Sequence, residues 1–340
     1  MTTYKEIRGT NIEAVATDPS NPVEGQVWYN TTSNVLKGNA ATTAGSWATG
    51  GSLNTGRRNM AGAGVSNSSA LGFGGDSPPT PGYANTESYN GSSWTEVADL
   101  NTARGNAGGN GTQTSALAFG GTPNPAKTVT EQWNGSSWTE VADLNTGRSN
   151  LAAAGADNTS ALAFGGLGTP PGATTYDLTE SWNGSSWTEV NDLNLARTQL
   201  MGFGIKTSAL ACGGEGDFGP PPQSVNTELW NGTNWTEVNN LSFTRTGGGS
   251  AGADNTSGLI FGGFDHSPTD FRTNKTELWN GTNWTEQADL SGTKYGSQAG
   301  AGTASSAISF GGEGPSNEQR TGTEEWTGAG APVVRTFTTS

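Results

Sequence analysis

A basic residue recurs along this sequence at a nearly constant interval, as if one cation belonged to each of several equivalent units. Its six positions are Arg57, Arg104, Arg148, Arg197, Arg245 and Lys294. Because arginine presents a planar fork of donors that suits a carboxylate or a phosphate, six such cations on one surface would bind an anion. Repeat-equivalent residues usually serve shared structure, however, so each cation could instead pair with a glutamate or a strand end of a repeat.

The side chains that enzymes most often use for catalysis are scarce. The chain has one histidine, His266, and one cysteine, Cys212. A zinc or copper site draws several ligands from His and Cys, and a catalytic triad needs a histidine held between two partners. Cys212 also occupies a place that Phe119 and Phe164 hold in equivalent units, which indicates a core position. We therefore expect no enzymatic activity, no metal and no cofactor.

The composition indicates a repetitive β-structure. Glycine accounts for 53 of the 340 residues, only 31% of the chain is hydrophobic, and 12 tryptophans supply much of its large apolar surface. No stretch keeps a 3.6-residue apolar period, which argues against long helices. The net charge of −14 argues against nucleic acid or an anionic membrane as a partner. The sequence also lacks a run of membrane-spanning length and the apolar core of a signal peptide.

An internal repeat organises the sequence. The phrase Trp-Asn-Gly-x-x-Trp-Thr-Glu begins at residues 133, 182, 230 and 279, and a copy that starts with Tyr begins at residue 89. The second tryptophan lies at positions 94, 138, 187, 235 and 284, and Trp47 extends the series backwards with spacings of 44–49 residues. A Gly-Gly pair ends at residues 75, 121, 166, 214, 263 and 312. The six cations follow the same register, so the repeat has six copies.

Each copy contains four short segments with strand character. In one copy these are Arg148–Ala154, Ser160–Phe164, Leu178–Trp182 and Trp187–Val190, separated by Asp-Asn, Gly-Gly and Asn-Gly signals. Asp-Asn and Asn-Gly mark tight turns between antiparallel strands. Four such strands make one blade of a β-propeller, with the small residues of the first segment at the crowded centre. The sequence thus predicts an all-β, six-bladed propeller over residues 45–330, with the tryptophans mainly in its core.

The repeat resembles the kelch repeat, in which paired glycines after an apolar strand are followed by an aromatic residue, a turn and a tryptophan. The resemblance covers residues 45–328, and the chain departs from the family where Trp-Asn-Gly replaces the usual Tyr-Asp-Pro. It implies a propeller of four-stranded antiparallel blades. One function that goes with this resemblance is that of a cellular kelch-type interaction module.

Two ways of closing the ring are compatible with the sequence. The last copy ends at Trp326 without a second tryptophan and the first begins at Trp47 without a third strand, so residues 46–53 can complete the blade that contains Lys294. Alternatively, Val35–Gly38 supplies a third strand and Val333–Phe337 a fourth. Joining the two ends removes free strand edges, so we favour the first arrangement and treat residues 331–340 as a C-terminal tail.

Residues 1–44 lie outside the repeat and are predicted to form an attachment segment with a β-hairpin. Two short strand-like segments, 25–30 and 35–37, flank a polar turn. The phrase Asn-Pro-x-x-Gly-Gln-x-Trp-Tyr-Asn-x-Thr-x-x-x-Leu-Lys, which starts at Asn21, resembles a segment of structural proteins of tailed bacteriophages, especially marine ones. The resemblance implies a virion protein, such as a tail fibre or adhesin, that docks to other virion proteins through this segment and presents the propeller outwards.

Loop variation indicates that one face of the propeller is a recognition surface. Strand parity places the uniform Asp-Asn and Asn-Gly turns on one face, and the cations with six loops of differing length on the other. Those loops carry the aromatic residues Tyr83, Tyr176, Phe218, Phe264 and Phe271. Variable loops on a rigid scaffold are a common design for recognition, although surface loops also vary by drift. We therefore regard these five aromatics, with the six cations, as candidate binding residues.

The function that the sequence favours is a non-enzymatic virion appendage that recognises a host-surface glycan or protein. An alternative is a purely structural virion protein, such as a capsid decoration or a tail component, that contacts only other virion proteins. Self-association into a homo-oligomer is compatible with either role.

Overall fold

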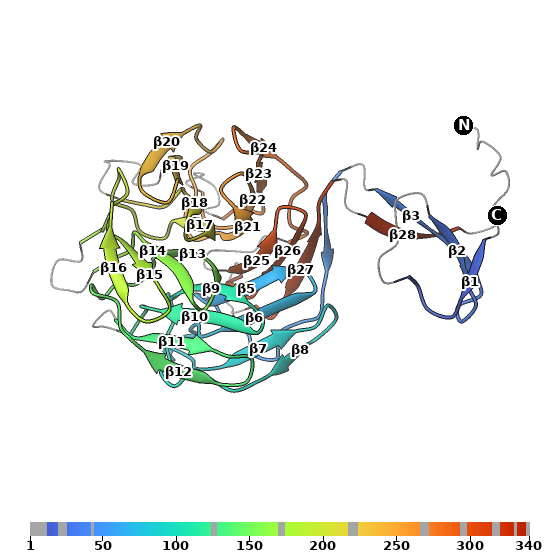
Figure 1. Cartoon of the computed structure of the whole chain (residues 1–340), viewed down its shortest axis with the longest axis horizontal. Helices are drawn as coiled ribbons and strands as arrows, with labels where there is room; N and C mark the ends of the chain where they lie inside the picture. Colours follow the sequence, from blue (N-terminus) through green and yellow to red (C-terminus); the bar gives the residue numbers. More distant parts are fainter. Residues whose placement is uncertain are drawn as a thin grey trace. The chain divides into compact units, whose positions relative to one another are not determined.

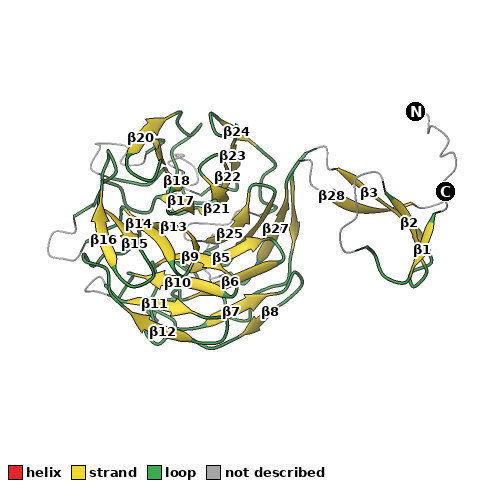
Figure 2. Cartoon of the chain, viewed as in Figure 1, coloured by secondary structure: helices red, strands yellow, loops and turns green. Residues whose placement is uncertain are grey.

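A computed structural model places the regular structure of the described residues in β-strands. It describes residues 12–19, 26–41, 44–123, 128–168, 174–216, 224–265, 272–292, 298–314, 320–329 and 332–337. Within these ranges there is no helix (Figure 2). The chain divides into two compact units, a larger one of Ser46–Thr327 and a smaller one made of Met1–Gly45 with Gly328–Ser340.

The described part of the larger unit forms six sheets of four strands each. Sheet 1 contains β5 (Ala61–Ser66), β6 (Ser69–Phe73), β7 (Thr86–Tyr89) and β8 (Trp94–Glu96). Sheet 2 contains β9 (Gly108–Thr112), β10 (Ser115–Phe119), β11 (Thr130–Trp133) and β12 (Trp138–Val141). Sheet 3 contains β13 (Ala152–Asp157), β14 (Ser160–Phe164), β15 (Thr179–Trp182) and β16 (Trp187–Val190). Neighbouring strands in these sheets are antiparallel, as the turn signals predicted.

The remaining three sheets repeat the same order. Sheet 4 contains β17 (Met201–Ile205), β18 (Ser208–Cys212), β19 (Thr227–Trp230) and β20 (Trp235–Val238). Sheet 5 contains β21 (Gly249–Asp254), β22 (Ser257–Phe261), β23 (Thr276–Trp279) and β24 (Trp284–Glu286). Sheet 6 contains β25 (Ala299–Thr303), β26 (Ser306–Phe310), β27 (Thr323–Thr327) and β4 (Ser46–Thr49). Its fourth strand therefore comes from the opposite end of the unit.

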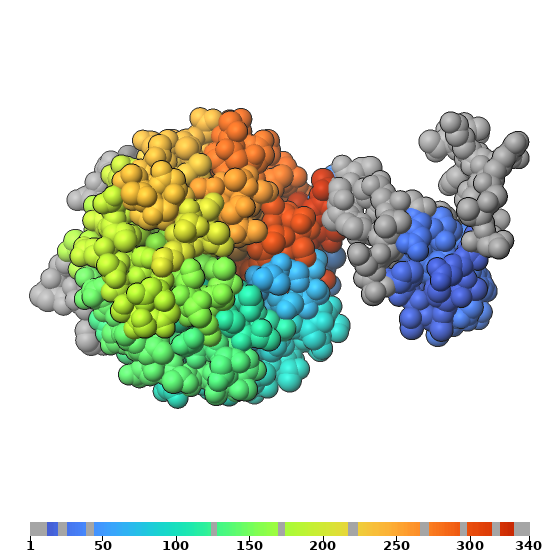
Figure 3. All heavy atoms as spheres, viewed as in Figure 1, coloured from blue at the N-terminus to red at the C-terminus, as the bar shows by residue number. Residues whose placement is uncertain are grey.

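The pairing of β4 with β27 is the arrangement that the sequence favoured. Trp47 lies opposite Trp326 in the ladder, and their ring centroids are 5.3 Å apart. Figure 3 shows the sheets as successive sectors in sequence order, with the cyan atoms of sheet 1 next to the red and orange atoms of sheet 6. A strand from the beginning of the repeat region thus completes the sheet at its end.

The first strands of the six sheets gather at the centre of the larger unit (Figure 1). Each lies against the first strands of its two neighbours, and β25 of sheet 6 lies against β5 of sheet 1. Glycine permits this approach, since a Cβ at Gly202 would lie 2.5 Å from Cζ of Phe164 in the preceding sheet. Four-stranded antiparallel sheets arranged around an axis in this way form a β-propeller.

Tryptophans join neighbouring sheets farther from the centre. Each of six hydrophobic clusters combines buried side chains from two adjacent sheets. The second tryptophan of the repeat also donates its Nε1–H to the threonine hydroxyl that opens the third strand of the preceding sheet. The six pairs are Trp47–Thr276, Trp94–Thr323, Trp138–Thr86, Trp187–Thr130, Trp235–Thr179 and Trp284–Thr227, at 2.9–3.1 Å. Five of these tryptophans are buried in the core, as predicted, and Trp47 is half-buried against it.

The smaller unit is a four-stranded sheet in the order β1–β2–β3–β28. Its strands are β1 (Glu13–Val15), β2 (Val27–Asn30), β3 (Val35–Ala41) and β28 (Pro332–Phe337). The β2–β3 pair is the predicted hairpin, and β1 adds to it in parallel. The prediction of a C-terminal tail at residues 331–340 was wrong, because β28 pairs with β3 and does not complete sheet 6. Since β4 already holds the outer position of sheet 6, the chain end finds backbone partners on the open edge of β3 instead.

Asp18 organises the hairpin phrase of the smaller unit. Its Oδ1 accepts hydrogen bonds from Trp28 Nε1 at 3.1 Å and Asn30 Nδ2 at 2.7 Å, and its Oδ2 accepts one from Lys37 Nζ at 2.7 Å. These bonds, led by that from Lys37, lower the pKa of Asp18 to about 2. The residues of this phrase therefore stabilise the hairpin itself.

Candidate functional site

The larger unit presents two different faces. On one of them, the Asn-Gly turns lie beside the turns between first and second strands, and a Cβ at Gly91 would lie 3.0 Å from Cβ of Ser68. At the other ends of the strands, the second glycine of a Gly-Gly pair donates a backbone hydrogen bond to the linker that leads into the next sheet. The amide of Gly75 bonds the carbonyl oxygen of Arg104 at 2.9 Å. We call this second side, with the Gly-Gly loops, the variable-loop face.

The five described cations of the repeat lie beneath this face with no exposed surface. Arg104 shows the pattern, since its Nη2 donates to Glu131 at 2.6 Å and its Nη1 to the carbonyl oxygen of Val129 at 2.7 Å. The equivalent ion pairs are Arg57–Glu87 at 2.7 Å, Arg148–Glu180 at 3.1 Å, Arg197–Glu228 at 2.7 Å and Arg245–Glu277 at 3.4 Å. Each glutamate belongs to the third strand of the sheet that its arginine introduces.

The sequence left open that the repeat arginines form an exposed, anion-binding ring, and for the five described arginines this expectation was wrong. Each has 0% exposure, so a ligand at the surface does not reach its guanidinium. Burial lowers the pKa of Arg104, and the neighbouring charge of Glu131 opposes that shift. Burying an unpaired charge is costly, which explains why a glutamate accompanies each arginine. The recurring Thr-Glu pair at the start of the third strand was the sequence signal for these partners.

The glutamates also anchor the linkers between sheets. The Oε2 of Glu131 accepts the backbone N–H and the Nδ2–H of Asn101 at 2.7 and 2.8 Å, and its Oε1 accepts the N–H of Thr102 at 3.1 Å. Both residues lie between β8 and β9. One buried carboxylate therefore fixes the arginine and the incoming chain together, which is a structural role.

Two of the five aromatic candidates occupy one repeat position on the variable-loop face. Tyr83 and Tyr176 are both half-buried. The N–H of each donates to the carbonyl oxygen of the second glycine of the Gly-Gly pair that opens the same loop, Gly75 or Gly166, at 2.8 Å. The same backbone contact is made by Ser224, Thr273 and Arg320 in later sheets. The same backbone geometry thus recurs from sheet to sheet, and the side chain that it presents differs among the sheets.

Phe264 belongs to a second position of this kind, directly after the Gly-Gly pair. In successive sheets that position holds Asp76, Thr122, Leu167, Glu215, Phe264 and Glu313. In the first five sheets an isolated backbone bridge joins it to the residue that follows the repeat arginine, as in Thr246–Phe264. Acidic, hydroxyl, aliphatic and aromatic groups therefore occupy equivalent places around one face. Phe218, Phe271 and Lys294 lie outside the described residues.

Sequence reasoning missed a ring of left-handed residues around the central axis. Asn59, Asn106, Asn150, Gln199 and Gly247 have φ angles of 52–61°, and each lies two positions after a repeat arginine. From Asn106 onwards, the N–H of each donates to the carbonyl oxygen of the one before at 2.9 Å. Asn tolerates positive φ, so the recurring Arg-x-Asn pattern was the available signal. These residues surround a cavity of about 110 Å³.

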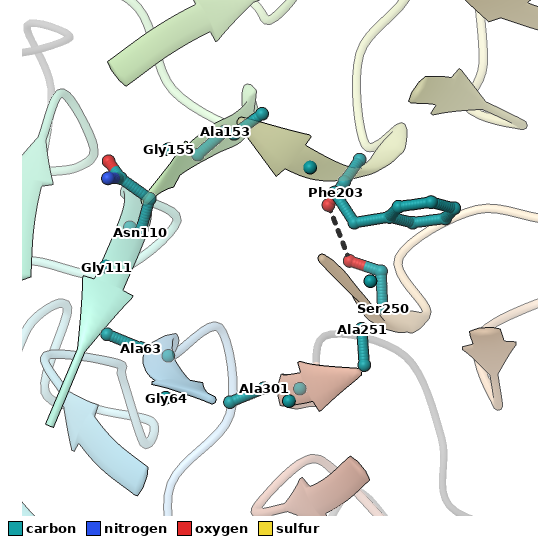
Figure 4. Close-up of a pocket in the computed structure, with 18 residues that line it drawn as sticks. Ala63, Gly64, Asn110, Gly111, Ala153, Gly155, Phe203, Ser250, Ala251 and Ala301 are labelled. Carbon is teal, nitrogen blue, oxygen red and sulfur yellow. Dashed lines mark hydrogen bonds between the residues drawn. The ribbon is translucent and has the colours of Figure 1, made fainter. Parts of the chain in front are cut away.

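Two further cavities, of about 120 and 90 Å³, follow along the same first strands. Figure 4 shows the last of them, enclosed by strands of all six sheets and lined mostly by glycine and alanine. The ring of Phe203 points away from this space, and Ser250 Oγ donates to the carbonyl oxygen of Gly202 at 2.7 Å. Because the lining residues of this cavity include no charged side chain, the diverse side chains of the variable-loop face offer more specific contacts.

The thiol of Cys212 lies in the core. Cys212 is fully buried, and burial raises the pKa of its thiol to about 12, in keeping with the predicted core position. The described ranges contain no group of three or more His, Cys, Asp or Glu that could hold a metal ion. No helix in those ranges has the length and apolar character to span a membrane.

Comparison with known proteins supports the assignment of the β-propeller fold. The solved structure of YjhT is similar, with a TM-score of 0.67 and 13% sequence identity over an alignment that covers 84% of this chain and 99% of that chain. At this identity the likeness shows the β-propeller fold alone. No protein-family model matches the chain, and no curated protein matches it.

Proposed function

We propose that the six sheets of the larger unit are the blades of a closed, kelch-like six-bladed propeller. The support is that contacts between consecutive sheets recur between sheets 6 and 1. Trp94 of sheet 1 bonds Thr323 of sheet 6 at 2.9 Å, and the amide of Gly312 bonds the carbonyl oxygen of Arg57 at 2.8 Å. A ring without a seam leaves only short strand edges at its perimeter and makes a rigid scaffold.

We propose that this scaffold belongs to a non-enzymatic bacteriophage virion appendage, a tail fibre or adhesin that recognises a host-surface glycan or protein. The observation that carries the recognition role is the position after the Gly-Gly pair, where one backbone geometry presents chemically different side chains. Thr122, Leu167, Glu215 and Phe264 are all half-exposed there. The opposite face repeats its Asn-Gly turns almost unchanged. Different side chains at equivalent positions of a rigid support suit selective binding.

The virion assignment rests on the hairpin phrase that resembles bacteriophage structural proteins. That phrase lies in the smaller unit, which has its own sheet and its own polar centre at Asp18. We propose that this unit docks to other virion proteins while the propeller contacts the host. A purely structural virion protein is the second candidate, and the same resemblance supports it equally. The two differ in whether the variable-loop face binds the host.

Adsorption of virions to host cells tests the proposal. Tyr176→Ala removes a half-buried aromatic from the variable-loop face, whereas Asn183→Ala alters an exposed turn on the opposite face. We expect Tyr176→Ala to slow adsorption at an unchanged melting temperature, and Asn183→Ala to leave adsorption intact. Normal adsorption by Tyr176→Ala together with its loss in Asn183→Ala would show that the wrong face was chosen.

A further inference from the structure

A pocket opens on the variable-loop face between sheets 1 and 2. Its volume is about 360 Å³, larger than the axial cavities and within the roughly 300–1,000 Å³ typical of small-molecule sites. The loop between β6 and β7 contributes one side and the loop after β10 the other. The residues that give it its character are Pro78, Pro79, Pro81, Pro123, Arg58 and Asp76.

Proline forms most of the pocket wall. Pro78, Pro79 and Pro81 are exposed, and Pro123 of the neighbouring sheet faces the same space. A proline ring is apolar and its φ angle is fixed, so such a wall loses little conformational freedom when a ligand binds. It offers a flat apolar surface without hydrogen-bond donors.

The other end of the pocket is polar and acidic overall. Arg58 Nε donates to Asp76 Oδ1 at 2.8 Å, and Arg58 Nη1 bonds Glu313 of sheet 6. Among the described residues Arg58 Nη2 has no hydrogen-bond partner, and the Arg58 side chain is 27% exposed, in contrast to the buried repeat arginines. Arg58 and Asp76 line the pocket, and Glu313 pairs with Arg58 without lining it. Together the one cation and the two carboxylates give a formal charge of −1. This group therefore keeps both donor and acceptor capacity toward a ligand.

We propose that this pocket binds a neutral sugar ring of a surface glycan, an inference that rests on the proposed function and names its ligand class. A pyranose has an apolar C–H side that fits the proline wall. Its hydroxyl groups both donate and accept, so they match Asp76 and the free donors of Arg58 together. The net charge of −1 disfavours acidic sugars, phosphates and sulfates, which would repel the two carboxylates. A neutral hexose satisfies the wall and the polar end at once.

Titration of the full-length chain with simple glycosides tests this assignment. The neutral probes are the methyl glycosides of glucose, galactose and mannose. The methyl glycoside of glucuronic acid is the charged counterpart of the glucoside. Binding of each probe is followed by ligand-observed NMR. We expect at least one neutral glycoside to bind. Repulsion between like unit charges about 5 Å apart in water-like surroundings changes an affinity about fourfold. We therefore expect the glucuronide to bind at least about fourfold more weakly than the glucoside.

Variants locate the binding. Pro81→Ala combined with Pro123→Ala removes half of the proline wall and should weaken glycoside binding about tenfold or more, as loss of well-placed apolar contacts does. Thr139→Ala, at an exposed site on the outer strand of sheet 2, should leave binding unchanged. Melting temperatures of both variants verify that they fold.

Three outcomes would overturn the inference. They are equal binding by the double proline variant, tighter binding of the glucuronide than of the glucoside, and absence of binding by every neutral glycoside. If one of these occurs while Tyr176→Ala still slows adsorption, the proposed function stands and only its ligand is wrong. If adsorption is independent of the variable-loop face, the proposed function itself fails.

Discussion

Replacing Glu131 by glutamine should destabilise the larger unit strongly, because this carboxylate is the buried partner of Arg104. Both side chains have 0% exposure. Four donor groups converge on the two carboxylate oxygens, from the guanidinium, from Asn101 and from Thr102. Glutamine keeps the shape but removes the charge. It also turns one acceptor into a donor that faces other donors.

The expected size of the effect follows from the burial of the pair. Removing one partner of a buried ion pair leaves the other charge uncompensated and costs about 3–5 kcal/mol. In a unit of this size each kcal/mol lowers the melting temperature by roughly 2 °C. The variant should therefore melt about 6–10 °C below the parent chain.

Glu140 provides a matched control. It lies directly opposite Glu131 in the β11–β12 ladder, also follows a threonine, and is exposed. Glu140→Gln should change the free energy of unfolding by less than about 0.5 kcal/mol, as surface substitutions usually do. The assay is differential scanning calorimetry of the three proteins at the same pH and scan rate. If Glu131→Gln melts within about 1 °C of Glu140→Gln, Arg104 is not a buried charge in solution, and the arginines again become candidates for the binding surface.

Two further predictions concern the chain ends. Removing residues 1–45 should leave the melting of the larger unit unchanged, whereas removing residues 1–49 also deletes β4 with Trp47 and should lower it by several degrees. Calorimetry of the two truncations measures this, and equal melting would refute the role of β4 in sheet 6. Asp18 has a pKa of about 2 in the folded chain against an ordinary value of 3.8, so it stabilises the smaller unit above about pH 4, and this contribution is lost as the pH falls toward 2. The indole N–H signal of Trp28 in NMR spectra should follow this loss, and an Asp18→Asn variant with the same pH profile would contradict it.

The repeat made the architecture predictable from sequence. Six copies of one pattern place strands, turns and tryptophans in the same register, so a weak local signal in one copy is supported by the others. The last copy of the repeat lacks its second tryptophan, and Trp47 at the start of the repeat region supplies one. This predicted the pairing of β4 with β27, and the structure has this pairing. Cys212 could be placed in the core because phenylalanine holds its position in other copies.

Tertiary structure alone decided which of the recurring polar residues are accessible. Arg104 and Arg58 belong to the same kind of linker, yet the first is buried against Glu131 and the second is partly exposed beside a proline-lined pocket. Sequence spacing shows that a cation recurs, but exposure depends on how neighbouring sheets cover it and on which carboxylate comes within bonding distance. The same holds for β28, whose partner is an open strand edge formed by residues about 300 positions earlier in the chain. Contacts between segments so far apart arise only when the sheets assemble.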